Sequence, residues 1–89
     1  MIEDTLKERQ KVHGSFSSNA EMAQILKREM RGGKNWTALN YEQKQALEMI
    51  VGKMGRILAG DHNHSEHWHD ISGYGTLGEN ACVGRKNPK

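Results

Sequence analysis

Four histidines fall within eight residues of this chain, and imidazole is a common ligand of transition metals. They are His62, His64, His67 and His69. Two metal ligands on one helix stand three or four positions apart, whereas His67 and His69 are only two apart. His67 with Asp70 is the usable pair, and His64 can join it from the preceding loop. Because these three complete no known ligand pattern, we expect no bound metal and histidines that cap a helix or face solvent.

Paired carboxylates are a second possible source of chemistry. All-α nucleotide pyrophosphohydrolases hold Mg²⁺ with E-x-x-E and E-x-x-D pairs on adjacent helices, because Mg²⁺ prefers oxygen ligands. Here Glu42 and Glu48 are six residues apart and lie on different faces of one helix. The next helix offers His67 and Asp70, with histidine where an acid is needed. The magnesium site is therefore incomplete, which argues against this chemistry.

Two basic residues beside helical glycines are a third feature. Gly52 and Gly55 lie in a predicted helix interior, where each costs about 1 kcal/mol relative to alanine. Either a close helix crossing or a ligand lying against that face can offset this cost. Lys53 and Arg56 lie beside and opposite the apolar stripe of the helix, so the core does not need them. Two cations one turn apart suit a phosphate or pyrophosphate, and the alternative is a solvated basic face.

The segment from Trp68 to Tyr74 mixes aromatic and acidic residues. We expect Trp68 in the core, because aromatic residues at helical spacing are mostly packing residues. Tyr74 is a candidate to stack a base. Asp70 is a candidate to accept a hydrogen bond from a ribose hydroxyl or to orient a cation, and its alternative role is a salt bridge to Lys53 or Arg56.

Helical spacing of apolar residues predicts the elements that position these side chains, and no strand pattern is present. A weak polar helix covers 2–12 and breaks at Gly14. Ser18 and Glu21 match an S-x-x-E capping box, which predicts the start of a second helix. The glycine pair beginning at Gly32 ends that helix.

The strongest helix is predicted over 41–59, after a loop over 33–40. Its apolar stripe is wide enough to face a core and consists of Leu47, Ile50, Val51, Met54, Ile57 and Leu58. A fourth helix is expected to begin with Ser65 as its N-cap, and residues 80–89 are predicted to be a flexible tail. The expected fold is thus a single all-α domain over 1–89, a small bundle of three to four helices completed by oligomerisation.

Composition supports this expectation. The 89 residues are 35% hydrophobic, below the usual share, so the core of a monomer is thin and oligomerisation is a common remedy. No apolar run is long enough for a membrane span, and the amino-terminal segment lacks a signal-peptide pattern. The single cysteine, Cys82, favours a reducing cytoplasm. A formal charge of +2 without a basic stripe gives no reason to expect DNA or RNA as a partner.

Motifs spread over nearly the whole chain resemble a small phage and prophage family known only as a domain of unknown function. They are R-x3-HG-x-F-x2-NA from Arg9, W-x2-L from Trp36, ALEMI-x2-K-x2-RIL-x-GD from Ala46 and W-x-DI-x-GY from Trp68. The lysine and arginine helix followed by the last motif is the most specific part. In the family pattern a histidine often precedes the helix lysine, where this chain has Gly52. Any chemistry of that histidine is then missing here.

The resemblance implies a phage origin, and small phage proteins often counter host defence. One class of them oligomerises and sequesters nucleotide immune signals, such as cyclic ADP-ribose isomers and cyclic dinucleotides. A protein of that class needs cations for phosphates, aromatic or apolar surface for a base, and no catalytic apparatus. By this analogy we expect a homo-oligomeric nucleotide binder in the host cytoplasm, without a cofactor. The candidate ligand-binding residues are Arg9, His13, Trp36, Lys53, Arg56, Asp70 and Tyr74.

Within this hypothesis Lys53 and Arg56 hold phosphates, and Tyr74 or Trp36 stacks a base. Two other hypotheses stay open. The first is a metal-dependent, all-α nucleotide pyrophosphohydrolase of phage nucleotide metabolism, with Glu48 as a ligand alongside the aspartate of the fourth helix. The second is a protein that binds and inhibits a host defence protein through its helix surface.

Overall fold

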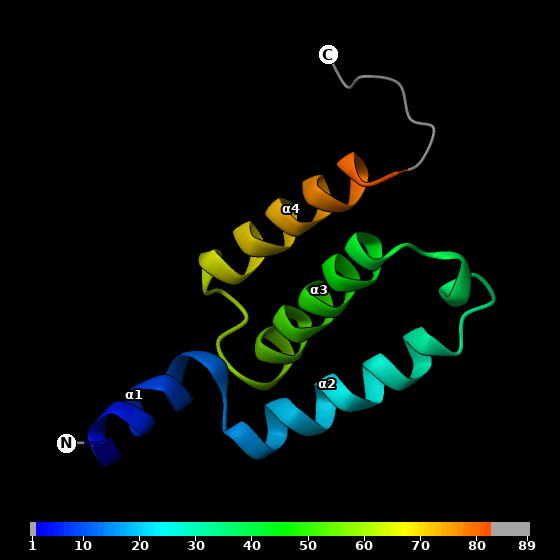
Figure 1. The fold of residues 1–89 in the computed structure, drawn as a ribbon. Helices are drawn as coiled ribbons and strands as arrows, with labels where there is room; N and C mark the ends of the chain where they lie inside the picture. The colour runs from blue at the N-terminus through cyan, green and yellow to red at the C-terminus, as the bar shows by residue number, and fades with distance from the viewer. Residues whose placement is uncertain (1, 83–89) are drawn as a thin grey trace.

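A computed structural model describes residues 2–82, which form four α-helices and one short 3-10 helix (Figure 1). In chain order these are α1 (Ile2–His13), α2 (Phe16–Arg31), η1 (Trp36–Ala38), α3 (Tyr41–Ala59) and α4 (Ser65–Asn80). No strand occurs among these residues, and the predicted all-α class is confirmed. Residues 83–89 of the predicted tail lie outside the described residues. None of the described helices has both the length and the apolar character needed to cross a membrane.

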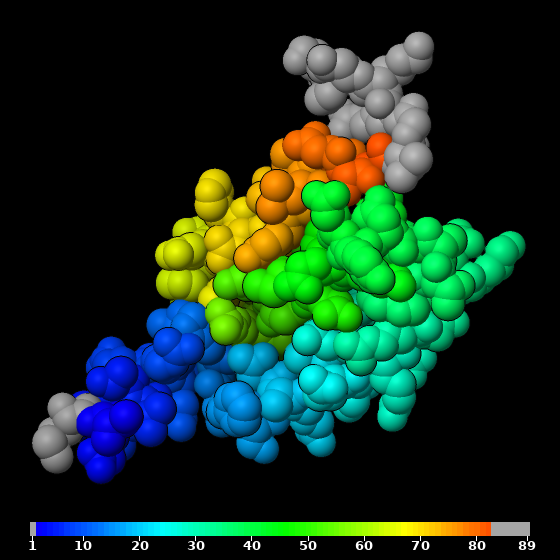
Figure 2. All heavy atoms as spheres, viewed as in Figure 1, coloured from blue at the N-terminus to red at the C-terminus, as the bar shows by residue number. Residues whose placement is uncertain are grey.

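The helices are arranged as an open layer with α3 in the middle. α3 packs against α4 on one side and against α2 on the other, and its side chains fill the space between these two helices (Figure 2). α1 projects from one end of the layer (Figure 1). Because α3 lies between two neighbours in one plane, both faces of the layer carry exposed side chains.

The core is thin and includes a histidine. Among residues 2–82 four small or branched apolar side chains are buried, those of Ala23, Ala46, Val51 and Ile57. The most buried side chain of α4 is His67, at 2% exposure, and Trp68 is 55% exposed. The prediction that Trp68 belongs to the core is therefore wrong. The two residues are adjacent on the helix, so the rotation of α4 that turns His67 towards α3 carries the tryptophan about 100° away.

The start of α2 differs from the prediction. Ser15 is the N-cap, and its Oγ accepts a hydrogen bond from the Ser18 backbone N–H at 3.1 Å. The predicted capping box of Ser18 with Glu21 is thus wrong. The helix begins earlier because Gly14, with φ of +80°, reverses the chain just before Ser15, which leaves Phe16 as the first helical residue.

A capping box does form at the start of α3. The Asn40 side chain accepts from the Gln43 N–H at 2.8 Å, and the Gln43 side chain accepts from the Asn40 N–H at 3.0 Å. Asn40 also donates to the Ala81 carbonyl at 2.9 Å, which ties the end of α4 to the start of α3. At the start of α4 the N-cap is His64, without a side-chain cap, and Ser65 is the first helical residue instead of the predicted cap.

Only one of the two glycines inside α3 mediates a helix crossing. A Cβ on Gly55 would approach the Asn19 Oδ1 to 2.9 Å and the Ala23 Cβ to 3.3 Å, so α2 and α3 cross closely there. A Cβ on Gly52 would meet no atom within 4 Å. The packing explanation for these glycines therefore holds for Gly55 and not for Gly52.

The turn after α1 and the turn after α3 cross in direct backbone contact. A Cβ on Gly14 would collide with the Ala59 carbonyl, and a Cβ on Gly60 would collide with the Val12 carbonyl. A hydrogen bond from the Asp61 N–H to the Val12 carbonyl, at 2.8 Å, joins the two turns. This crossing holds the carboxyl end of α1 against the segment that leads into α4.

The crossing predicts opposite effects for two glycine-to-alanine substitutions. We expect Gly60→Ala to lower the free energy of unfolding by more than about 2 kcal/mol, because overpacking forces the backbones apart. Gly52→Ala is the matched control and should raise it by up to about 1 kcal/mol, because alanine favours the helix and has room. Urea denaturation followed by circular dichroism measures both. A Gly60→Ala protein as stable as the original would contradict the crossing.

Candidate functional site

Five of the seven predicted ligand-binding residues line a single cavity of ≈ 280 Å³, which we call the central cavity. Three helices contribute to it: α1, α3 and the first two turns of α4. Its lining residues are Arg9, His13, Lys53, Arg56, His64, Glu66, His67 and Asp70. The crossing of the two glycine turns places the α1 residues of this set beside those of α4.

An ion pair joins α3 to α4 across the cavity. The Lys53 Nζ lies 2.9 Å from the Asp70 Oδ2, and the two side chains are 15% and 32% exposed. The hydrogen bond from Lys53 lowers the pKa of Asp70 below its usual value, so the carboxylate stays ionised. Asp70 thereby holds the lysine ammonium in one place at the cavity wall.

Three histidines meet beside this pair. A hydrogen bond of 3.0 Å joins the His13 Nδ1 to the His67 Nε2. The His64 ring centroid lies 4.7 Å from that of His67 and 6.2 Å from that of His13. The His67 Nδ1 is buried, and no group of the described residues bonds to it. This favours the tautomer in which His67 carries its hydrogen on Nε2 and donates it to His13. The buried Nδ1 is then an acceptor without a partner, whereas in the other tautomer it would be an N–H without a partner.

The surroundings keep His13 and His67 neutral. The pKa of each is lowered, chiefly because burial disfavours the charged ring. The positive charge of Arg56 adds to the effect at His13, and His64 and Lys53 add to it at His67. As the accepting partner in the bond between the rings, neutral His13 carries its hydrogen on Nε2, where it is an additional donor.

Positive charge exceeds what the cavity itself neutralises. Lys53 and Asp70 form one pair, which leaves the guanidinium groups of Arg9 and Arg56 against the carboxylate of Glu66. Within residues 2–82 neither guanidinium makes a hydrogen bond or a salt bridge. Both can therefore bind an oxyanion without breaking an existing contact, and arginine suits phosphate because it offers two parallel donors.

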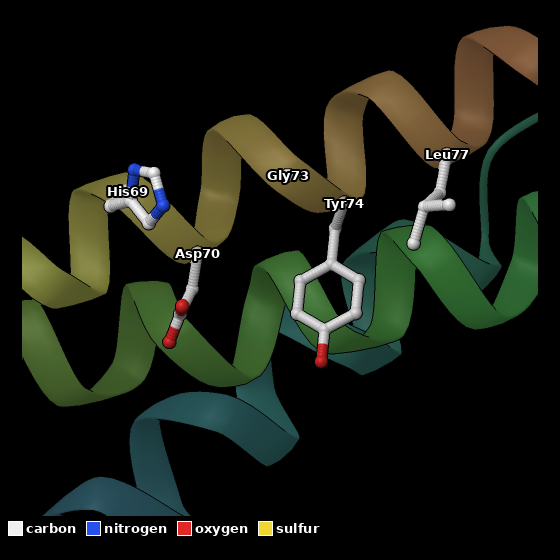
Figure 3. A pocket seen from close by; sticks show the side chains of 5 residues that line it. All are labelled: His69, Asp70, Gly73, Tyr74 and Leu77. Atoms are coloured by element: carbon white, nitrogen blue, oxygen red, sulfur yellow. The ribbon is translucent and has the colours of Figure 1, made fainter.

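The other two predicted residues lie elsewhere. Tyr74 lines a neighbouring cavity of ≈ 280 Å³ with His69, Asp70, Gly73 and Leu77, which we call the α4 cavity (Figure 3). Asp70 borders both this cavity and the central one. Trp36 belongs to η1, at the other end of the layer from α1 (Figure 1). The structure therefore does not bring Trp36 to the central cavity. The Trp36 ring instead lies next to Lys44, whose Nζ is 5.6 Å from the ring centre.

The predicted metal-ligand candidates have other contacts in this structure. Among residues 2–82 no group of three or more histidine, cysteine, aspartate or glutamate side chains is arranged to hold a metal ion. Of the predicted candidates, His64 and His67 lie ring against ring and Asp70 is bound to Lys53. Glu48 pairs with Arg31 of α2 at 3.1 Å, on the opposite side of α3 from Asp70.

Sequence reasoning missed the inward position of His67, which it took for a capping or solvent-facing residue. A signal for it was present. His67, Ile71, Tyr74 and Gly78 follow the i, i+4, i+7, i+11 spacing of one helix face. Extending the apolar stripe of α4 backwards by one turn would have placed the histidine on the buried face.

Comparison with protein-family models, with curated proteins and with solved structures gave no match for this chain. The resemblance to a phage family stays a prediction.

The lowered pKa values predict that acid destabilises the fold before its carboxylates titrate. In the unfolded chain a histidine has a pKa near 6.5, and in the fold those of His13 and His67 are lower. Between these values the unfolded chain binds more protons, so the free energy of unfolding should be constant above about pH 6.5 and fall as the pH drops towards 5. Urea denaturation at a series of pH values measures this slope.

Two variants test whether the two shifted histidines cause this pH dependence of the free energy of unfolding. His13→Asn should flatten it, because one of the two shifted groups is lost. His69→Gln should leave it unchanged, because His69 is exposed and outside the central cavity. A free energy of unfolding that stays constant from pH 7 to pH 5 would show that the pair does not titrate as argued.

Proposed function

We propose that this protein binds a nucleotide through its phosphates in the central cavity and releases it unchanged. The observation that carries the proposal is the set of unpaired cations there. Arg9 and Arg56 face one cavity without salt-bridge partners among residues 2–82. Charge-assisted hydrogen bonds from such groups are short and strong, and phosphate is their natural acceptor.

The other groups of the cavity support the same ligand. Lys53 is ordered in advance by Asp70, so little side-chain entropy is lost when it contacts a phosphate. Neutral His13 supplies a further donor without adding charge. Asp70 stands at the border with the α4 cavity, where its free oxygen can accept from a sugar hydroxyl.

Sequestration fits this arrangement better than hydrolysis. A pyrophosphohydrolase of the kind considered above needs acidic residues that converge on Mg²⁺. Here Glu48 of α3 is bonded to Arg31 of α2, and Asp70 of α4 is bonded to Lys53, on the side of α3 that faces α4. The two carboxylates thus point to different neighbours.

The biological setting that we propose is a phage protein that removes a nucleotide immune signal in the cytoplasm of the host. The family resemblance and the small size support it. A homo-oligomer is part of the proposal, because the open layer leaves apolar surface uncovered. A groove of ≈ 330 Å³ between α3 and α4 has an entirely apolar lining, made by Ile50, Met54, Ile57, Leu58, Trp68 and Ile71. Two such faces packed together would supply the second layer that a small domain needs.

A retention experiment tests the function. The protein is mixed with nucleoside mono-, di- and triphosphates, cyclic dinucleotides and cyclic ADP-ribose isomers, with and without Mg²⁺, and then removed by filtration. We expect one compound to be missing from the filtrate and to return intact when the protein is heated. A smaller product would show an enzyme. A filtrate that retains every compound would overturn nucleotide binding and leave a protein partner to be sought.

Substitutions locate the binding. Changing Lys53 and Arg56 together to alanine should weaken binding at least about 100-fold, because each charge-assisted hydrogen bond contributes roughly 1.5–3 kcal/mol. The matched control changes Lys27 and Arg28 of α2, which lie outside the central cavity. Trp36→Ala should also bind normally. Isothermal titration calorimetry compares the affinities, and an unchanged affinity in the Lys53 and Arg56 double variant would remove the site.

A further inference from the structure

A further cavity adjoins the central one. It lies between α1 and α2, has a volume of ≈ 310 Å³ and is called here the α1–α2 cavity. Its lining residues are Leu6, Arg9, Gln10, Gly14, Phe16, Asn19 and Arg56. Arg9 and Arg56 also line the central cavity, and Asp70 is shared by the central and α4 cavities. The central cavity thus has a neighbour across the two arginines and another across the aspartate.

The α1–α2 cavity has the side chains that recognise a nucleobase. Phe16 is 85% exposed and Leu6 is also exposed, so aromatic and apolar surface is available for stacking. The side-chain amides of Gln10 and Asn19 form no hydrogen bond within residues 2–82. Each amide offers both a donor and an acceptor, which is what the edge of a base requires. Of its lining residues, the sequence had predicted ligand binding for the two arginines and not for Phe16, Gln10 or Asn19.

The α4 cavity offers a second stacking surface. The Tyr74 ring extends from α4 on the same side as the Asp70 carboxylate (Figure 3). Gly73 lines the same cavity, and a Cβ on it would meet no atom within 4 Å other than those of its chain neighbours. No packing contact explains Gly73, so the part of the cavity that it lines is open to a ligand.

We propose that the ligand carries two aromatic bases joined through phosphates, with one base in each flanking cavity. This inference rests on the proposed function, because the phosphates occupy the central cavity. Arg9 and Arg56 then stand between the phosphates and one base, where a guanidinium can bind an oxyanion or stack on a ring. Asp70 stands between the phosphates and the other base. A dinucleotide fills all three cavities, whereas a cyclic ADP-ribose isomer, with one adenine, leaves one base cavity empty.

The test compares ligands that differ in the number of bases. Titration calorimetry is run with inorganic pyrophosphate, AMP, GMP, cyclic di-AMP and cyclic di-GMP. We expect a cyclic dinucleotide to bind at least about tenfold more tightly than its mononucleotide, because each stacked base strengthens binding by roughly 10- to 100-fold. Equal affinity for the dinucleotides and the mononucleotides would overturn the two-base inference and leave the phosphate site intact. Failure of pyrophosphate and of every nucleotide to bind would instead overturn the proposed function itself.

Variants of each base cavity complete the test. Phe16→Ala and Gly73→Val should each reduce dinucleotide affinity about tenfold or more, the first by removing a stacking ring and the second by filling part of the α4 cavity. Both should bind pyrophosphate as the original protein does, which shows that they are folded. Tyr41→Ala is the matched control, since Tyr41 is an exposed aromatic residue outside the three cavities. Tight dinucleotide binding that neither Phe16→Ala nor Gly73→Val weakens would refute the assignment of the bases.

Discussion

The contact between two glycine turns is the constraint on which the rest of this structure depends. Neither Gly14 nor Gly60 has room for a Cβ, because each lies against the backbone of the other turn. α1 has little apolar surface of its own, so this contact and the hydrogen bond from Asp61 to Val12 determine where the helix lies. The orientation of α1 in turn decides whether its basic and imidazole side chains face α3 and α4. The central cavity exists because this one close approach is sterically possible.

The site is also part of the core. His67 occupies the inward position of α4 that an apolar residue would fill in an ordinary small domain, and its side chain is hydrogen-bonded to His13 of α1. Two neutral imidazoles therefore replace apolar packing where three helices meet. Such a polar contact adds directionality because hydrogen bonds require defined geometry. It also ties the integrity of the fold to the protonation state of the site, since a positive charge at this position would be buried among other cations.

Some charged groups of the central cavity pair with each other, and others are left to contact a ligand. Lys53 and Asp70 satisfy each other and join α3 to α4, while Arg9 and Arg56 keep their donors unused among the described residues. On the other side of α3 the arginine is paired, because Arg31 forms a salt bridge with Glu48. Unpaired arginines side by side repel one another, and an anion removes that repulsion. This is the physical reason for regarding the cavity as a place for phosphate.

The sequence by itself determined the helices, because apolar spacing and glycine breaks act within one or two turns of chain. It also singled out Lys53 and Arg56, which lie beside and opposite the apolar stripe of α3 and are not needed for a core, and Asp70 of the next helix as a candidate to orient a cation. It failed where an outcome depended on segments far apart in the chain. Ser15 and not Ser18 is the N-cap of α2, because the turn at Gly14 lets the helix begin earlier. His67 and not Trp68 is buried, because contact with α3 sets the rotation of α4. Only the tertiary structure decided which side chains share a cavity, since the crossing that brings α1 to α4 joins turns more than forty residues apart.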